Sequence, residues 1–291
     1  DQPRSRGLGD VYKRQFQAGL TALSKIAKTY LGVGVEQHCN ALGEAKNVEL
    51  NVFDGPCPAG NVGIQVNNID PVNKGEVVWT VDPASVIFFG RLFLTGKVDL
   101  HKKVAVAGSE MKLTGYANVL VGTPLAAFVE AQLKSTSHVR LINGNPLTGV
   151  KTTLADYVGG HTSEITAIPE GDDCDEMLGW ILPRTDQFST SRSYLSWLFG
   201  KKKEYNLDAR IKGGERHMIM SGEYDQVLPM DIFGEYLIKA IIAGDIDKQE
   251  QLGIYEVSPE DFAVAEFVDS SKLELQKIVR DGLNILRKEN A

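Results

Sequence analysis

Helix-like and strand-like segments alternate between residues 16 and 107, and this alternation constrains the fold more than any other feature of the sequence. Leu20, Leu23 and Ile26 recur at the spacing that places apolar side chains on one face of a helix. Residues 30–35 and 48–53 are short runs of strand length. Strands and helices that alternate through short links predict a parallel sheet covered by helices.

The rest of this series extends the same pattern. Further helices are expected at residues 36–46 and up to residue 68, and further strands at 77–81 and 104–107. Asp82-Pro83 predicts a helix start, because an Asp side chain accepts from free backbone amides and Pro fits the first turn. These elements predict a Rossmann-like α/β domain over residues 16–108.

Three further regions follow. Residues 109–160 predict a small sheet with one helix laid across it. Residues 161–225 predict antiparallel strand pairs, with strand-like runs at 164–168, 178–181, 207–211 and 217–220.

Residues 226–291 are expected to form a helical domain. Ser258-Pro259 marks one helix start, and Ser271 with Glu274 matches a capping box for the last helix. The apolar stripe of that last helix comprises Leu275, Ile278, Val279, Leu283 and Leu286.

The first fifteen residues differ in composition from the rest. They are rich in Arg, Gly and Gln and lack an amphipathic period. We expect residues 1–15 to be translated adapter or cloning sequence, outside the fold. The domain sequence would then start near Phe16, with an N-terminal portion missing.

Charge and hydropathy exclude several classes of protein. The net charge of -7 argues against non-specific binding to nucleic acid or anionic lipid. No run approaches the ~20 apolar residues of a spanning helix. We also find no signal peptide. We therefore expect a soluble chain that another subunit holds at any membrane.

Cysteine and histidine spacing argues against metal centres. The 3 cysteines lie far apart, so neither a disulfide framework nor a four-thiolate iron–sulfur cluster is expected. The 5 histidines are scattered and show no zinc-ligand spacing. The sequence predicts no metal site and no catalytic constellation.

The most suggestive segment for binding is the loop at residues 55–63, GPCPAGNVG. It follows a predicted strand and opens a predicted helix, where backbone amides can approach a phosphate. The candidate contacts are Gly55, Pro58, Gly60 and Asn61. The loop matches neither the dinucleotide fingerprint nor the P-loop, and its two prolines remove two amide donors. A rigid turn that shapes a protein interface is the favoured alternative.

An acidic run provides a second, weaker candidate. Asp172, Asp173, Asp175 and Glu176 could bind calcium, but they lack the spacing of an EF-hand loop. A solvated turn is the favoured interpretation.

Several motifs occur together in the order of one known family. They are GPCPAGNVG at 55–63, DPVN at 70–73, VWTV at 78–81, GEYDQVLPMDI at 222–232, AGDID at 243–247, QLG at 251–253 and SPED at 258–261. This ordered set resembles the A subunit of the bacterial sodium-translocating NADH:quinone oxidoreductases. The resemblance runs collinearly from about Phe16 to Asn290.

The resemblance implies a fold for each region. The first domain would be a Rossmann-like relative of the flavin-binding subunit of respiratory complex I. Residues 109–160, which include 122–125 and 143–149, would be a soluble-ligand-binding β-grasp (SLBB-like) module. The C-terminal helices would match those that hold an iron–sulfur cluster in complex I, although residues 228–291 contain no cysteine.

The resemblance also implies a function. Such complexes are translocases that pass electrons from NADH through flavins and iron–sulfur centres to ubiquinone and export sodium. This chain would carry no cofactor itself and would shape the quinone site from the cytoplasmic side of the inner membrane. Its partners would be the membrane subunits, above all the B subunit, with ubiquinone as a candidate ligand.

Two alternatives belong to other classes, and a third is a closer relative. One is a free-standing flavin- or NADH-dependent oxidoreductase that uses the 55–63 loop as its cofactor cradle. Another is a soluble ligand-binding module. The third is the C subunit of the ferredoxin:NAD oxidoreductase complex, which should carry clustered cysteines.

Overall fold

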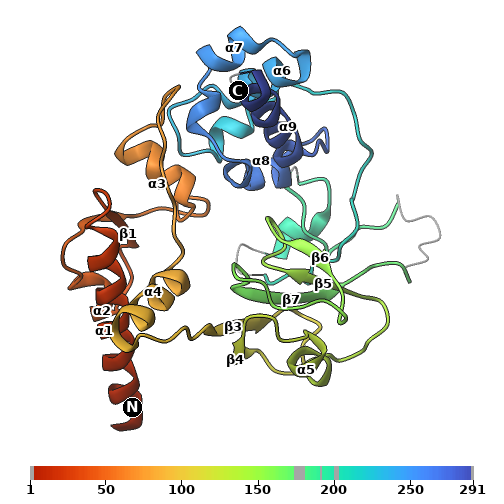
Figure 1. Ribbon diagram of the computed structural model, residues 1–291. Helices are drawn as coiled ribbons and strands as arrows, with labels where there is room; N and C mark the ends of the chain where they lie inside the picture. The colour runs from red at the N-terminus through yellow and green to blue at the C-terminus, as the bar shows by residue number, and fades with distance from the viewer. Residues whose placement is uncertain (1–2, 174–180, 191, 200–202, 290–291) are drawn as a thin grey trace. The chain divides into compact units, whose positions relative to one another are not determined.

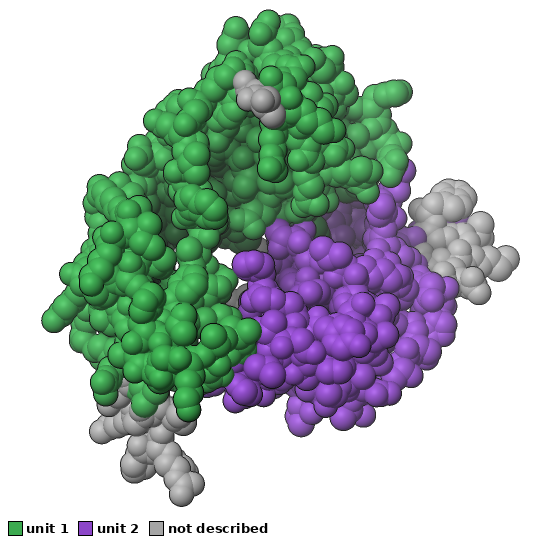
Figure 2. All heavy atoms as spheres, in the orientation of Figure 1, with its two compact units in different colours: residues 1–100, 215–291 green, residues 101–214 purple. Residues whose placement is uncertain are grey.

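The chain folds into two compact units (Figure 2). The computed structural model describes residues 3–173, 181–190, 192–199 and 203–289. Unit 1 combines residues 1–100 with 215–291, and unit 2 comprises residues 101–214. The N-terminal and C-terminal regions therefore belong to one unit, into which the second is inserted.

Two long helices organise the beginning of unit 1. They are α1 (Pro3–Leu23) and α4 (Pro83–Thr95), and Phe16, Leu20 and Val86 form the buried core of this part. The helices approach closely at Gly19, where a Cβ atom would lie 2.1 Å from the carbonyl oxygen of Val86. Asp82 caps α4 by accepting from the Ser85 amide at 2.9 Å, which confirms the predicted helix start.

Helix α1 begins inside the segment expected to be foreign. The sequence pattern predicts no helix before residue 16, yet α1 extends back to Pro3. Adding turns to an existing helix is much easier than nucleating one, so a weak periodic pattern does not prevent this extension. The foreign origin of residues 1–15 stays a prediction.

The parallel sheet of unit 1 is small. Strands β1 (Tyr30–Gly34) and β2 (Glu49–Phe53) pair in parallel as expected, and short helices α2 (Asn40–Gly43) and α3 (Val62–Ile69) follow them (Figure 1). The strand predicted at residues 77–81 is absent, and Trp79 there is 87% exposed. A strand needs a hydrogen-bonding neighbour, and in the described part of the chain this segment has none.

The C-terminal part of unit 1 is helical, as predicted. Its helices are α6 (Gly234–Ala243), α7 (Ile246–Gln251), α8 (Ala263–Val268) and α9 (Leu275–Glu289), with 3-10 turns η3 (Tyr224–Gln226), η4 (Ile254–Glu256) and η5 (Pro259–Phe262). The predicted stripe of α9 packs into their common core. Ser258 caps η5 in a capping box, as expected from Ser258-Pro259.

The predicted capping box at Ser271 is wrong. Helix α9 begins only at Leu275, and the Ser271 hydroxyl accepts from the backbone amide of Ile219 at 3.1 Å. The amide of Gln276 in the first turn of α9 donates instead to Glu266 at 2.8 Å. A carboxylate supplied by the preceding helix therefore takes the place of the local cap.

Unit 2 is built on one five-stranded sheet with the order β4-β3-β7-β5-β6. The strands are β3 (His101–Ala107), β4 (Gly115–Leu120), β5 (Val139–Asn143), β6 (Val150–Thr152) and β7 (Glu164–Pro169). Helix α5 (Ala126–Val129) contributes Val129 to the sheet's core and continues into the turn η1 (Glu130–Gln132). A further turn, η2, spans Leu195–Phe199. The strand expected at 104–107 thus pairs here with β4 and β7, rather than with β1 and β2.

The predicted antiparallel region at 161–225 is only partly present. Its first run is β7, which pairs antiparallel with β5 but lies in the middle of the unit 2 sheet. Residues 207–211 and 217–220 form no strand. Their backbone hydrogen bonds are isolated and form no ladder, as in the bond from Ala209 N to Pro169 O at 3.0 Å. Most of the run at 178–181 lies outside the described residues.

Among the described residues, no helix combines the length and apolar character needed to cross a bilayer.

Candidate functional site

The loop at residues 55–63 ends at the amino end of α3. The first backbone N–H groups of a helix have no partner within the helix and attract negative charge. Asn61 occupies the position before α3, where its side chain could cap the helix. It does not, and its Nδ2 donates to the carbonyl oxygen of Glu260 at 3.0 Å.

The carboxylate of Asp261 lies at this helix end. Asp261 belongs to η5 and is fully buried. A Cβ atom on Gly63 would lie 2.3 Å from its Oδ2 and 2.7 Å from its Oδ1. Oδ2 also accepts from the Ser258 amide at 2.8 Å and from the Ser258 hydroxyl at 2.7 Å. The Asp261 carboxylate therefore takes part in the capping box of its own turn, η5, and also lies at the amino end of α3, which is distant in the sequence.

Burial and the neighbouring hydrogen-bond donors shift the pKa of Asp261 in opposite directions. Burial raises the pKa of the Asp261 carboxyl, because the charged form loses hydration. Ser258, Asn61 and the N–H of Ile64 favour the charged form and hold this rise in check. The pKa of the adjacent Glu260 is also raised, first by burial and then by the charge of Asp261.

Further polar contacts join α3 and the segment after it to the C-terminal helices. Asn67 is buried and donates to Glu256 at 2.7 Å. Lys74 pairs with Glu250 at 2.7 Å. These contacts join α3 and the segment after it to the C-terminal part of unit 1 at more than one point.

The backbone of the 55–63 loop forms hydrogen bonds mainly within the loop itself. Gly55 adopts φ +147, a backbone conformation that favours glycine, and Pro58 is buried. The amide of Ala59 donates to Pro56 O at 2.9 Å and that of Asn61 to Pro58 O at 2.8 Å. Two amides of the supposed cradle are therefore engaged in tight turns. Cofactor binding by Gly55, Pro58, Gly60 and Asn61 stays a prediction, and the geometry favours the rigid turn.

A groove of about 1040 Å³ lies along α1 and α4. Ala22, Phe89 and Phe93 contribute apolar surface, and Lys25 and Lys46 contribute positive charge. Its size and largely apolar lining are those of small-molecule sites. The sequence pattern indicated both helices but not the groove, which depends on how they cross.

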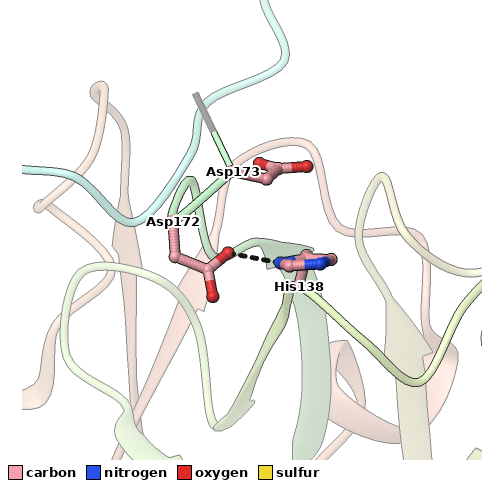
Figure 3. A group of neighbouring side chains, drawn as sticks. All are labelled: His138, Asp172 and Asp173. Atoms are coloured by element: carbon pink, nitrogen blue, oxygen red, sulfur yellow. Dashed lines mark hydrogen bonds and ion pairs between the residues drawn. The ribbon is translucent and has the colours of Figure 1, made fainter. Parts of the chain in front are cut away.

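Unit 2 brings His138 close to the acidic run (Figure 3). His138 precedes β5 and Asp172 follows β7, and the antiparallel register Val139↔Pro169 places both at one end of the sheet. The Nδ1 of His138 lies 2.8 Å from an oxygen of Asp172. This hydrogen bond raises the pKa of His138 above its ordinary 6.5.

With Asp173, these exposed side chains offer three possible metal ligands within 4.8 Å of one another. An exposed ion pair explains the same geometry. Asp175 and Glu176, which the sequence grouped with them, lie outside the described residues. The sequence does not single out His138, because only the pairing of β5 with β7 brings it to Asp172.

Two family models match successive parts of the chain. The NqrA second alpha/beta domain matches residues 10–98. The NQRA C-terminal domain, an SLBB-type model, matches residues 103–153. The gap between the matches falls at the start of unit 2.

Curated relatives match along almost the whole chain. The A subunit of the Na(+)-translocating NADH-quinone reductase is 33% identical over 281 residues in Neisseria meningitidis serogroup B and 34% identical over 277 residues in Pasteurella multocida. The same subunit of Vibrio vulnificus is 34% identical over 275 residues. In each case the match covers 94% of this chain but only 61% of the relative.

Proposed function

We propose that this chain, which belongs to the NqrA family, acts as part of the A subunit in a Na+-translocating NADH-quinone reductase. The observation that carries the proposal is the collinear similarity over 94% of the chain, with two NqrA domain models matched in succession. The chain spans 61% of the relatives' length. In this proposal the activity, NADH oxidation and quinone reduction coupled to sodium export, belongs to the whole complex and not to this chain alone.

Within such a complex, the chain would be a peripheral assembly subunit that shapes the quinone site. Its redox partners would supply NAD, flavin and iron–sulfur chemistry. Two observations support a chain without its own redox group. The 3 cysteines cannot supply four thiolates, and the Asp261 carboxylate lies at the helix end that a phosphate would need.

The proposed position is the cytoplasmic side of the inner membrane, against the membrane subunits and the B subunit in particular. The groove along α1 and α4 supports contact with ubiquinone, because Phe89 and Phe93 offer aromatic surface at a scale suited to a quinone ring. The finer fold assignments belong to the same proposal: β1 and β2 as part of a Rossmann-like sheet, and unit 2 as a soluble-ligand-binding β-grasp module.

Co-purification tests this proposal. A tagged form of the chain is expressed with the membrane subunits of a Na+-translocating NADH-quinone reductase. A full-length A subunit from the same complex serves as the positive control. We expect the tagged chain to recover, after detergent extraction, the B subunit. Recovery of no membrane protein of the complex, while the control recovers all of them, would contradict the proposal.

Spectroscopy and metal analysis test the cofactor statement separately. We expect the purified chain to show no flavin absorbance and no stoichiometric iron. Calorimetric titration with FMN and NADH should likewise give no binding heat. Tight binding of either cofactor would favour a free-standing oxidoreductase. A strong thermal shift with quinone head-group analogues, without any partner, would favour a ligand-binding module.

A further inference from the structure

The amino end of α3 has the properties of an anion site. The free N–H groups of its first turn and the helix dipole favour negative charge at this place. Gly63 leaves the approach to this helix end open, because any side chain there would occupy the space of the Asp261 carboxylate. Asn61 is directed to Glu260 and not to its own helix, so the local cap does not compete.

The Asp261 carboxylate, which lies at this helix end, has an unusual environment. Asp261 is 0% exposed, and in the part of the chain that the structure describes its Oδ1 meets no donor at full hydrogen-bond geometry, although it points toward α3. Burying a carboxylate is costly unless positive charge or donors compensate. Ser258 supplies donors to Oδ2 only. The remaining compensation comes from the Asn61 side chain and from the N–H of Ile64 at the positive end of α3.

We propose that the amino end of α3 is an anion-binding site whose ligand is the chain's own Asp261 carboxylate. The internal ligand docks η5 and the helices around it on the 55–63 loop, and it excludes external oxyanions. The helix end that could bind an external anion thus forms a contact within the protein instead. All of these groups belong to unit 1, so the site does not depend on which complex the chain joins.

The neighbouring contacts determine how the site responds when the carboxylate is removed. Asn67–Glu256 and Lys74–Glu250 do not involve Asp261, so they should keep η5 near α3 in its absence. Asp261→Ala would then leave a preformed cavity lined by helix amides. Formate has the same heavy atoms that this substitution removes, so it should fill the cavity.

Formate rescue is the test. We expect sodium formate to raise the melting temperature of Asp261→Ala by roughly 2–4 °C more than sodium chloride at the same ionic strength. Wild type should show no such difference, because its site is filled. Glu260→Gln is the matched control, since Glu260 is also partly buried but only its backbone contacts Asn61. In NMR spectra, formate should shift the amides of Gly63 and Ile64 in the alanine variant.

Each outcome decides the proposal. Equal effects of formate on all three proteins, or unchanged Gly63 and Ile64 signals in the variant, would overturn it. If Asp261→Ala does not fold even with formate, Asp261→Asn provides the answer, because it keeps the shape but loses the charge. We expect faster hydrogen exchange at Gly63 and Ile64 in that variant. Exchange as slow as in wild type would also overturn the proposal.

Discussion

The Asp261 carboxylate lies so close to Gly63 that a Cβ atom there would come within 2.3 Å of Oδ2. Gly63 is helical, and helix propensity alone would favour alanine at this position by about 1 kcal/mol. The close approach reverses that preference, because real Cβ atoms do not come so near to a carboxylate oxygen. A glycine that looks replaceable in the sequence is therefore required by a contact with the other end of the chain.

Gly63→Ala should lower the free energy of unfolding by about 1–3 kcal/mol, because the added methyl displaces a buried carboxylate. Gly60→Ala is the matched control, since no described residue comes within 4 Å of a Cβ atom there. Its effect should stay within ~0.5 kcal/mol. Urea denaturation measures both variants. Equal stability of the two would show that Asp261 does not constrain Gly63.

Acid should weaken unit 2 through Glu170. Arg140 binds both carboxylate oxygens of Glu170, at 2.5 and 2.6 Å, and lowers the pKa of Glu170 to about 2. A lowered pKa means that the stabilisation is complete above the ordinary 4.5 and is lost as the pH falls from there through about 2.

Because both side chains are partly exposed, we expect the loss to be ~1 kcal/mol after solvent screening. Urea unfolding at pH 6 and pH 3 measures it. Glu170→Gln should be less stable than wild type at pH 6, with a smaller further loss at pH 3. An identical pH response in variant and wild type would argue against this role of the pair.

His138 should titrate above its ordinary pKa of 6.5, because the hydrogen bond to Asp172 favours the protonated ring. NMR titration of the ring protons measures this directly. Asp172→Asn should bring the pKa down by removing the main cause. Asp173→Asn should lower it less, since Asp173 acts only through its charge. The reverse order of effects would contradict the observed geometry.

Trp79 should matter for assembly more than for stability. It is 87% exposed within an apolar segment of strand-like sequence that pairs with no strand in the described part of the chain. Trp79→Ser should therefore change the free energy of unfolding by less than ~0.5 kcal/mol. It should reduce recovery of the membrane subunits in the co-purification experiment. Tyr116→Ser in β4, where the side chain is 79% exposed, serves as the matched control.

Local sequence patterns were sufficient to predict those structural features that are formed by residues close together in the sequence. Asp82 marked the start of α4, Ser258 marked η5, and the apolar stripe of α9 packs as predicted. The order of motifs was also sufficient to recognise the family. These features depend on residues within a few turns of one another, or on order along the chain.

Local patterns failed where a strand or a cap needs a distant partner. Residues 77–81 have strand-like composition, but nothing in the described part of the chain pairs with them. Residues 104–107 do form a strand, but its neighbours are β4 and β7. Sequence composition does not specify which edge a strand will join, because that choice depends on the packing of whole elements.

The sequence by itself determined the family, most helices and the absence of a four-cysteine set. Only the tertiary structure placed Asp261 at Gly63 and His138 at Asp172. The physical reason is that an ionised side chain, whether buried like Asp261 or exposed like Asp172, is stabilised by the donors, charges and dipoles that the fold brings to it. Those groups come from segments as far apart as Asn61 and Glu260, which are 199 positions apart along the chain.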